Sequence, residues 1–180
     1  MANPELVNAV GGGGLSQEFD LQRLYEAFDG EEVRYDPEYW PGLYLRFTAD
    51  SPAIMIFRTG KYNIAGADSI RDLNETNEEF LGHIQELGIE IKDNSFEIRN
   101  LVFLDKYSKD LNLDKLVIAL GLENAEYEPE QFPGILYRPP NTKGTFMIFR
   151  NGKVLFTGSN SLEDATEAFS DLFEFLNKLF

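Results

Sequence analysis

The chain carries one eight-residue phrase twice, with its two copies 92 residues apart. Residues 35–42 read YDPEYWPG and residues 127–134 read YEPEQFPG, so five of the eight positions are identical. The same offset continues without a gap on both sides of the phrase, and a period of half the chain is too long for a solenoid repeat. The chain is therefore an internal duplication, and we assign residues 1–92 and 93–180 to two repeats of one integrated domain. A fold with such a pseudo-twofold axis suits a target that is itself nearly twofold symmetric, and duplex DNA is the most obvious one.

Composition places the chain among globular proteins and removes several kinds of site. Its 180 residues, of which 43% are hydrophobic, can form one good-sized core or two closely packed halves. No apolar run is long enough to cross a membrane, and the segment from Met1 to Val10 lacks the features of a secretion signal, so we expect a cytosolic protein. There is no cysteine, and the single histidine, His83, cannot form a multi-histidine centre. We therefore predict no disulfide, no metal site and no cofactor.

The net charge of −15 argues against nucleic-acid binding, because most proteins of that class are basic. Total charge is not local charge, however, and an acidic surface is also expected of a protein that stays solvated in a salt-rich cytoplasm. At 1 M salt, repulsion from phosphate is screened within about 3 Å. The charge therefore leaves DNA binding open and is compatible with a salt-adapted host.

Each half predicts the same order of elements. A short strand leads to a helix, a second strand runs up to the repeated phrase, three strands follow as a meander, and a long helix closes the half. Ser69 and Ser161 stand where the N-caps of the two long helices belong. The main predicted strands are 6–10, 43–47, 53–57 and 62–65 in the first half, and 97–104, 135–138, 145–149 and 154–157 in the second. The predicted apolar helix stripes are Leu21, Leu24, Tyr25 and Phe28; Leu113, Leu116, Val117 and Leu120; Ile70, Leu73, Phe80, Leu81, Ile84 and Leu87; and Leu162, Ala165, Phe169, Leu172, Phe173, Leu176 and Leu179.

Two of these strands predict an apolar outer face of the sheet. Side chains alternate across a sheet, so Ile54 and Ile56 should face the helices while Met55 and Phe57 face away, and residues 145–149 repeat this pattern. An antiparallel sheet usually keeps a polar outer face, and an exposed apolar patch implies a partner. Because no Pro/Ser-rich linker separates the halves, we predict an α+β fold in which one continuous antiparallel sheet carries all helices on one face.

With these residues in view, the chain resembles the archaeal and eukaryotic TATA-box-binding protein family over essentially its whole length. The resemblance is carried by the Tyr-x-Pro-Glu-x-aromatic-Pro-Gly phrase and by an Ile-Phe-x-x-Gly-Lys step, which occur in the family's order in both halves. It implies an internally duplicated saddle, whose continuous curved antiparallel sheet carries the helices on its convex face and lays its concave face on the DNA minor groove. The family is itself the standard example of such binding, in which apolar wedges between base steps kink the duplex by about 80°.

The resemblance carries three sets of DNA-contacting residues over to this chain. An aromatic ring can stack on a base exposed by a kink, an amide can donate to adenine N3 and thymine O2, and an apolar floor excludes the guanine amino group. Cations contact phosphates and fix the register. The intercalating residues are Trp40, Phe57, Phe132 and Phe149; the minor-groove residues are Asn8, Val10, Asn100, Val102, Met55, Met147, Leu155 and Thr157; and the phosphate contacts are Arg46, Lys61, Arg138, Lys143 and Lys153.

The resemblance also implies a protein partner. In the family, the acidic loop of the second half docks transcription factor B, and here Glu128, Glu130 and Gln131 keep that phrase. Pro129 stiffens the loop, which lowers the ordering cost of binding. RNA polymerase would then be recruited indirectly, in the archaeal cytosol and at the nucleoid. The protein would be a monomer on DNA, with weak self-association left open.

The first half departs from the family pattern more than the second. Trp40 stands in place of a phenylalanine, and Ser51 in place of a cation. Asn63 and Ala65 stand in place of a valine and a threonine on the DNA-facing floor. Gly11–Gly14 replaces a strand end with residues of low strand propensity, which we interpret as a flexible turn.

Two functions from different classes stay open. One is a general transcription initiation factor that binds and kinks A·T-rich promoter DNA. The other is a diverged paralogue, a protein-interaction module with weak or no specific DNA binding, which the net charge of −15 and the altered first-half floor favour. An enzyme is not predicted, because the sequence has no Ser/His/Asp set, and Gly11–Gly14 lacks the Lys-Ser/Thr of a phosphate-binding loop.

Overall fold

The computed structural model describes residues 2–159 and 161–180, which divide into two compact units. The N-terminal unit is Asn8–Arg99, and the C-terminal unit is Asn100–Phe180 together with the first residues of the chain up to Val7. Two long strands, β1 (Glu5–Gly14) and β6 (Ser95–Lys106), contribute residues to both units.

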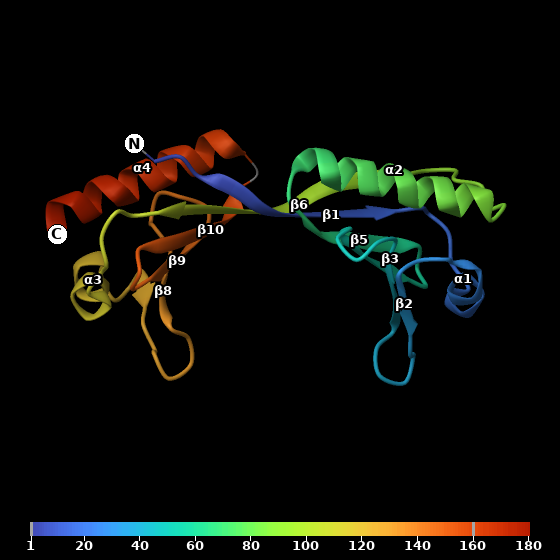
Figure 1. Cartoon of the computed structure of the whole chain (residues 1–180), viewed down its shortest axis with the longest axis horizontal. Helices are drawn as coiled ribbons and strands as arrows, with labels where there is room; N and C mark the ends of the chain where they lie inside the picture. The colour runs from blue at the N-terminus through green and yellow to red at the C-terminus, as the bar shows by residue number, and fades with distance from the viewer. Residues whose placement is uncertain (1, 160) are drawn as a thin grey trace. The chain divides into compact units, whose positions relative to one another are not determined.

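The N-terminal unit is a sheet with two helices on one side of it (Figure 1). Its strands neighbour one another in the order β2-β3-β4-β5-β1, and each of these pairs is antiparallel. Besides β1, the elements are α1 (Leu21–Ala27), β2 (Glu32–Tyr35), β3 (Gly42–Arg46), β4 (Ala53–Phe57), β5 (Lys61–Ala67) and α2 (Ile70–Glu86).

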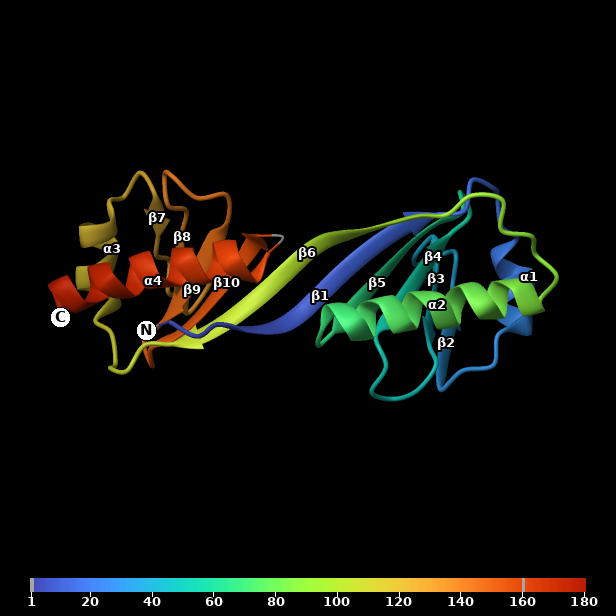
Figure 2. The ribbon, with the colours of Figure 1, turned by 90° about the horizontal axis from the view of Figure 1, so that it is seen from above.

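The C-terminal unit repeats this arrangement, with its long closing helix running over the strands (Figure 2). Its strands neighbour one another in the order β6-β10-β9-β8-β7, again all antiparallel. Besides β6, the elements are α3 (Leu113–Leu120), β7 (Ala125–Glu126), β8 (Gly134–Tyr137), β9 (Thr145–Phe149), β10 (Lys153–Ser159) and α4 (Leu162–Leu179). Over the chain, the hydrogen-bonded order β2-β3-β4-β5-β1-β6-β10-β9-β8-β7 confirms the predicted single antiparallel sheet with four helices.

Burial alternates along the strands as the sequence predicts. In β4, Ile54 and Ile56 are completely buried, while Met55 and Phe57 are partly exposed on the opposite face. The β9 strand repeats this pattern, with Phe146 and Ile148 in the core. The core of each unit therefore lies between the sheet and its helices.

The long helices begin where the sequence predicts. The Ser69 hydroxyl accepts a hydrogen bond of 3.1 Å from the Asp72 backbone N–H at the start of α2. The Ser161 hydroxyl accepts the equivalent bond, also 3.1 Å, from Asp164 at the start of α4. Each serine thus satisfies one of the backbone donors that a helix start leaves free, which confirms both N-caps.

The interpretation of Gly11–Gly14 as a flexible turn is wrong, because these residues are part of β1 and pair with β5. A Cβ atom on Gly13 would lie 2.6 Å from the Tyr62 ring, and one on Gly11 would overlap the ring of Phe96. Tyr62 and Phe96 are themselves stacked, with ring centroids 6.0 Å apart and ring planes 8° apart. Large rings from neighbouring strands therefore fill the space that the glycines leave, and the strand forms despite its low propensity.

A few residues of the predicted apolar helix stripes are exposed instead of buried. Ile70 and Leu162 are the first residues of α2 and α4, and Leu87 caps the end of α2, so they lie where the sheet does not cover the helix. Tyr25 packs against Tyr35 at the edge of the sheet. Their exposed fractions are 40% for Ile70, 36% for Leu87, 56% for Leu162 and 40% for Tyr25. The stripe of α3 is buried as predicted. Among the residues that the structure describes, no helix combines the length and apolarity that a membrane span requires.

Candidate nucleic-acid interface

In each unit, one face of the sheet is left uncovered by the helices, and we call it the open face. The predicted DNA-contacting side chains of the strands lie there, because they alternate with buried core residues. In the N-terminal unit the open face includes Asn8, Val10, Gly12, Met55, Phe57, Asn63 and Ala65; in the C-terminal unit it includes Asn100, Val102, Leu104, Met147, Phe149, Leu155 and Thr157.

Each unit brings its two predicted wedge residues together as an aromatic pair. The ring centroids of Trp40 and Phe57 are 5.6 Å apart, with ring planes at 69°. Those of Phe132 and Phe149 are also 5.6 Å apart, at 60°. All four rings are only partly buried, so the matched pairs present aromatic surface to a ligand.

The glycine that ends the repeated phrase makes room for these rings. Gly42 pairs across the sheet with Phe57, and Gly134 pairs in the same way with Phe149. A Cβ atom on Gly134 would lie 3.0 Å from the Phe132 ring and 3.2 Å from the Phe149 ring, and one on Gly42 would overlap the Trp40 ring. The glycine of the phrase is therefore a steric requirement of the aromatic pairs.

The two predicted minor-groove asparagines are held in a defined orientation. The side-chain oxygen of Asn8 accepts a hydrogen bond of 3.0 Å from the Gly66 backbone N–H. The side-chain oxygen of Asn100 accepts one of 2.8 Å from the Thr157 hydroxyl. Because both oxygens are engaged by the protein, each amide has its NH₂ group left to donate, and donors are what the adenine N3 and thymine O2 acceptors require.

The floors of the two open faces differ in chemistry. In the C-terminal unit, Leu104 pairs with Leu155, and Leu155 pairs with Met147, which makes a continuous apolar surface. In the N-terminal unit, Gly12 pairs with Asn63, and Asn63 pairs with Met55.

Three contributors to these floors were not predicted from the sequence. Leu104 and Leu136 pair with predicted floor residues, and their positions follow from strand alternation alone. Arg99 lies beside Gly12: a Cβ atom on that glycine would be 3.2 Å from the Arg99 Nε atom. No sequence signal indicated Arg99, because its place depends on how β1 and β6 pair.

The five predicted phosphate contacts lie in different surroundings. The Arg46 guanidinium donates to the Ala49 carbonyl at 3.0 Å, and Arg138 forms an ion pair of 3.0 Å with Glu126. The remaining three, Lys61, Lys143 and Lys153, are exposed. Lys61 and Lys153 follow the matched hairpin turns, where Gly60 and Gly152 have φ angles of +80° and +78°.

The acidic loop of the second half has the same turn as its counterpart in the first half. The Glu128 carbonyl accepts hydrogen bonds from the backbone N–H groups of Gln131 and Phe132, both 2.9 Å long. Asp36 plays the same part for Tyr39 and Trp40, at 3.1 Å and 2.8 Å. The Gln131 side chain also donates to the Glu128 carboxylate, and Glu130 is exposed. The predicted partner-binding residues are thus grouped at one loop tip.

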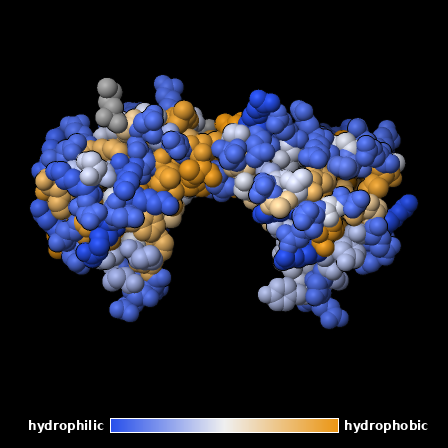
Figure 3. Space-filling model, viewed as in Figure 1, coloured by the Kyte–Doolittle hydropathy of each residue, from blue (hydrophilic) through white to orange (hydrophobic). Residues whose placement is uncertain are grey.

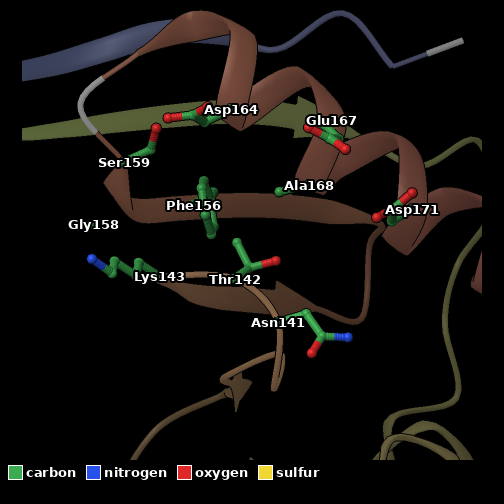
Figure 4. Close-up of a pocket in the computed structure, with 10 residues that line it drawn as sticks. All are labelled: Asn141, Thr142, Lys143, Phe156, Gly158, Ser159, Asp164, Glu167, Ala168 and Asp171. Atoms are coloured by element: carbon green, nitrogen blue, oxygen red, sulfur yellow. The ribbon is translucent and has the colours of Figure 1, made fainter.

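A pocket of about 440 Å³ lies away from the open face, between α4 and the loop before β9 (Figure 4). Asp164, Glu167 and Asp171 of α4 line one side of it, and Lys143 extends from the loop on the other side. Three of its ten lining residues are acidic and one is basic, so its lining does not suit DNA. Within the described ranges 2–159 and 161–180, no group of three His, Cys, Asp or Glu side chains is placed to hold a metal ion.

The comparisons with known proteins agree on one family. The family model described as transcription factor TFIID, or TATA-binding protein, matches residues 3–87 and again residues 95–179. The chain is 41% identical over 167 residues to TATA-box-binding protein C of Halobacterium salinarum, with 92% of each chain covered. It is 38% identical to the TATA-box-binding protein of Haloarcula marismortui, over 97% of this chain and 94% of that one. The solved structure of the Methanococcus jannaschii protein superposes with a TM-score of 0.82 at 33% identity, covering 98% of this chain and 99% of that one.

Proposed function

The chain belongs to the TATA-box-binding protein family, whose members are DNA-binding transcription factors and not enzymes, and from this premise we propose how it binds promoter DNA. The open faces of both units bind the minor groove of A·T-rich duplex DNA, and the aromatic pairs kink it. The observation that carries the proposal is the match between the two pairs, each 5.6 Å between ring centroids, in units that differ at many other positions. Because the chain is similar to haloarchaeal proteins, we place this function in an archaeal factor adapted to high salt.

The aromatic pairs supply the wedges. Unstacking a base step costs a few kcal/mol, which ring–base contacts must offset. Phe57 and Phe149 lie on the open faces, and Trp40 and Phe132 brace them from the adjacent loops. A pair of rings at each end of the site opens two base steps and bends the duplex between them.

The asparagine amides and the apolar floor supply the base preference. The side-chain oxygens of Asn8 and Asn100 are engaged by the protein, which leaves their NH₂ groups to donate, and A·T and T·A pairs both offer acceptors in the minor groove. The preference is therefore for A·T over G·C, with little sense of direction.

The two long helices, which lie on the other side of each sheet from the open face, are strongly acidic. The helices α2 and α4 each carry five acidic residues and only one Lys or Arg. Their outer surfaces are largely hydrophilic (Figure 3). Lys61, Arg99 and Lys153, by contrast, belong to strands of the sheet. DNA therefore approaches the less acidic side of each unit, and high salt screens the remaining repulsion.

The loop tip formed by Glu128, Glu130 and Gln131 recruits transcription factor B, and through it RNA polymerase. The two backbone hydrogen bonds to the Glu128 carbonyl preorganise this loop, which lowers the entropy lost on binding. Exposed carboxylates presented this way suit an Arg- or Lys-bearing surface through charge-assisted hydrogen bonds.

A second candidate function is a protein-interaction module that no longer binds DNA specifically. The polar floor of the N-terminal unit and the net charge of −15 favour it. A fluorescence-transfer bending assay on an A·T-rich duplex, titrated with salt, separates the two functions. Salt-dependent binding with bending, lost in a duplex of G·C pairs, supports the promoter-binding proposal. Recruitment of the factor without any bending of A·T-rich DNA would instead support the interaction module.

A further inference from the structure

The open faces of the two units differ most at one cross-strand pair. In the C-terminal unit this pair is Leu104 and Leu155, and at the matching positions, 92 residues earlier, the N-terminal unit has Gly12 and Asn63. An apolar pair is thus replaced by a carboxamide beside a glycine. The N-terminal floor holds a hydrogen-bonding group where the C-terminal floor holds none.

The local packing shows why a glycine accompanies this asparagine. A Cβ atom on Gly12 would lie 2.8 Å from the Asn63 side-chain oxygen and 3.3 Å from Cγ of Arg99. The two polar side chains therefore occupy the space above the glycine. Asn63 remains exposed, and Arg99 is 60% exposed and paired with Glu97 at 3.2 Å. The arrangement is a polar patch on an open face that also carries the apolar side chains of Val10, Met55 and Ala65.

The hydrogen-bond donors and acceptors of the base pairs in the minor groove indicate which ligand group suits this patch. A·T and T·A pairs present only acceptors there, and a G·C pair adds the guanine N2 amino group as a donor. A leucine floor buries that amino group without an acceptor, which is unfavourable. A carboxamide oxygen accepts from it, and the NH₂ of the same side chain donates to the acceptors of an A·T pair.

We propose that the open face of the N-terminal unit accepts a G·C base pair, with the Asn63 side-chain oxygen accepting a hydrogen bond from the guanine amino group. The C-terminal unit, with Leu104 and Leu155, remains restricted to A·T. The chain thereby reads its two half-sites by different rules, although its two halves share one fold. This inference rests on the proposed binding of both open faces to the minor groove.

The test measures base preference separately for each half-site. The chain has no cysteine, so a single Tyr39→Cys substitution at the exposed loop of the N-terminal unit can carry a DNA-cleaving iron chelate. The cleavage pattern on an A·T-rich duplex assigns one half-site to each unit. Single G·C substitutions are then scanned through both half-sites in competition binding.

The expected result is unequal discrimination. A single G·C pair in the C-terminal half-site should weaken binding about tenfold or more, as one mismatched base pair typically does. At the best-tolerated position of the N-terminal half-site, the loss should be less than about threefold. Measured against each variant's own binding to the all-A·T duplex, Asn63→Leu should raise that loss to about tenfold, and Leu155→Asn should create the same tolerance in the C-terminal half-site.

Three outcomes are distinguishable. Equal discrimination in both half-sites, unchanged by Asn63→Leu and Leu155→Asn, would overturn the inference while leaving minor-groove binding intact. Failure of the wild-type protein to bind or bend the A·T-rich duplex would instead contradict the proposed function. If Asn63→Leu failed to fold, as circular dichroism would reveal, Leu155→Asn alone would decide, because it adds the carboxamide to the other unit.

Discussion

The N-terminal and C-terminal units reach one strand order with different side chains at matching positions. On the core side, the N-terminal unit has Gly11 opposite Ile64 and Gly13 opposite Tyr62, whereas the C-terminal unit has Phe103 opposite Phe156 and Asp105 opposite Val154 at the matching places. The rings of Phe96 and Tyr62 occupy the space beside Gly11 and Gly13. The same strand order can therefore be filled by side chains from different positions, because a close-packed interior requires that the space be filled and not that one particular residue fill it.

The backbone constraints, in contrast, are the same in both units. Gly60 and Gly152, in the hairpin turns, have φ angles of +80° and +78°. Gly66 and Gly158 lie at β-bulges, where the register of β5 against β1 and of β10 against β6 shifts, and have φ angles of +91° and +97°. Such angles strongly favour glycine. Turn and bulge positions have therefore been kept, while core and surface positions have diverged around them.

The largest expected effect is on the loop tip formed by Glu128, Glu130 and Gln131. Recruitment of the protein partner should depend on this loop and not on the matching loop of the N-terminal unit. Replacing Glu128 and Glu130 by Lys should weaken recruitment of transcription factor B more than about 100-fold, because reversed charges meet a basic partner. Binary DNA binding should be unchanged. Gel-shift titration with and without the factor measures both quantities.

The matched control is charge reversal at Asp36 and Glu38, which form the equivalent loop of the N-terminal unit with the same turn. This variant should recruit the factor normally. Equal loss from both pairs of substitutions would show that general electrostatics, and not a docking site, governs recruitment.

Alanine at the matched hairpin glycines should destabilise both units equally. A Cβ atom on Gly60 would overlap the Gln17 carbonyl oxygen, and one on Gly152 would overlap that of Tyr107. Positive φ and a backbone clash together should lower the free energy of unfolding by about 3 kcal/mol in each case. Urea unfolding followed by circular dichroism measures this loss. A difference of more than about 1 kcal/mol between the two variants would mean that the hairpins are not equivalent.

Removing one wedge from each unit tests whether the aromatic pairs act alike. Phe149→Ala and Phe57→Ala should each reduce DNA bending and weaken binding by about 2 kcal/mol, since ring–base stacking is lost. Lys153→Ala, at a predicted phosphate contact, should weaken binding while leaving the bend angle unchanged. The bend angle from fluorescence transfer is the decisive quantity. An unchanged angle for Phe149→Ala would remove that residue from the wedges.

Alanine at the two bulge glycines, Gly66 and Gly158, should destabilise the two units by different amounts. Both losses should be smaller than those at the hairpin glycines. A Cβ atom on Gly66 meets nothing within 4 Å, whereas one on Gly158 would lie 2.9 Å from the Gly144 Cα atom. Gly66→Ala should therefore lower the free energy of unfolding by about 1 kcal/mol, from backbone strain alone, and Gly158→Ala by about 2 kcal/mol. Thermal unfolding of both variants under one salt condition compares them. The reverse order would contradict the packing described for the C-terminal unit.

The smallest expected effect is a pH dependence of stability that arises from Tyr62, a residue of the N-terminal unit. The Tyr62 hydroxyl donates to Asn77 at 2.6 Å, and burial raises its pKa from 10.0 to about 12. A raised pKa stabilises the folded state while the phenol is neutral, so this contribution is complete below pH 10 and is lost as the pH rises towards 12. The matching residue in the C-terminal unit, Val154, does not titrate.

Tyr62→Phe should lower the free energy of unfolding at neutral pH by about 1 kcal/mol, because its hydrogen bond is missing. The variant should then lose less stability than the wild type as the pH rises from 10 to 12, because it has no phenol to ionise. Fluorescence of Trp40, the single tryptophan, reports on the N-terminal unit. An identical alkaline profile in the wild type and the variant would show that Tyr62 does not ionise in this range.

Much of the fold follows from the sequence because its signals are local or repeated. The N-caps Ser69 and Ser161 were predicted from the repeat with its constant offset, and the structure confirms both. The alternation of apolar residues along the strand predicted that Met55 and Phe57 lie on the open face, as they do. The wedge residues Trp40, Phe57, Phe132 and Phe149 were predicted from the family resemblance. These features depend on residues close in sequence or on their copies 92 positions away.

The errors concern interactions between segments that no local pattern connects. Gly11 lies in a strand because Phe96, 85 residues further along, covers it. Arg99 was missed for the same reason, since its neighbour Gly12 is known only from strand pairing. Leu162 fits the helical period of α4 but precedes the part that the sheet covers, and periodicity does not reveal where a covering layer ends. Which strands pair, and which part of a helix the sheet covers, are settled only in the folded chain.

The glycine run of β1 has a consequence for the order in which the molecule opens. Glycine loses more conformational entropy on folding than other residues, by roughly 0.5–1 kcal/mol relative to alanine at each position. Residues Gly11–Gly14 therefore hold their strand through neighbouring rings and backbone hydrogen bonds, with little contribution of their own. Their amide hydrogens should exchange with solvent earlier than those of the matching residues Phe103–Lys106. The N-terminal open face is then the more adaptable of the two, and DNA binding should slow amide exchange there most.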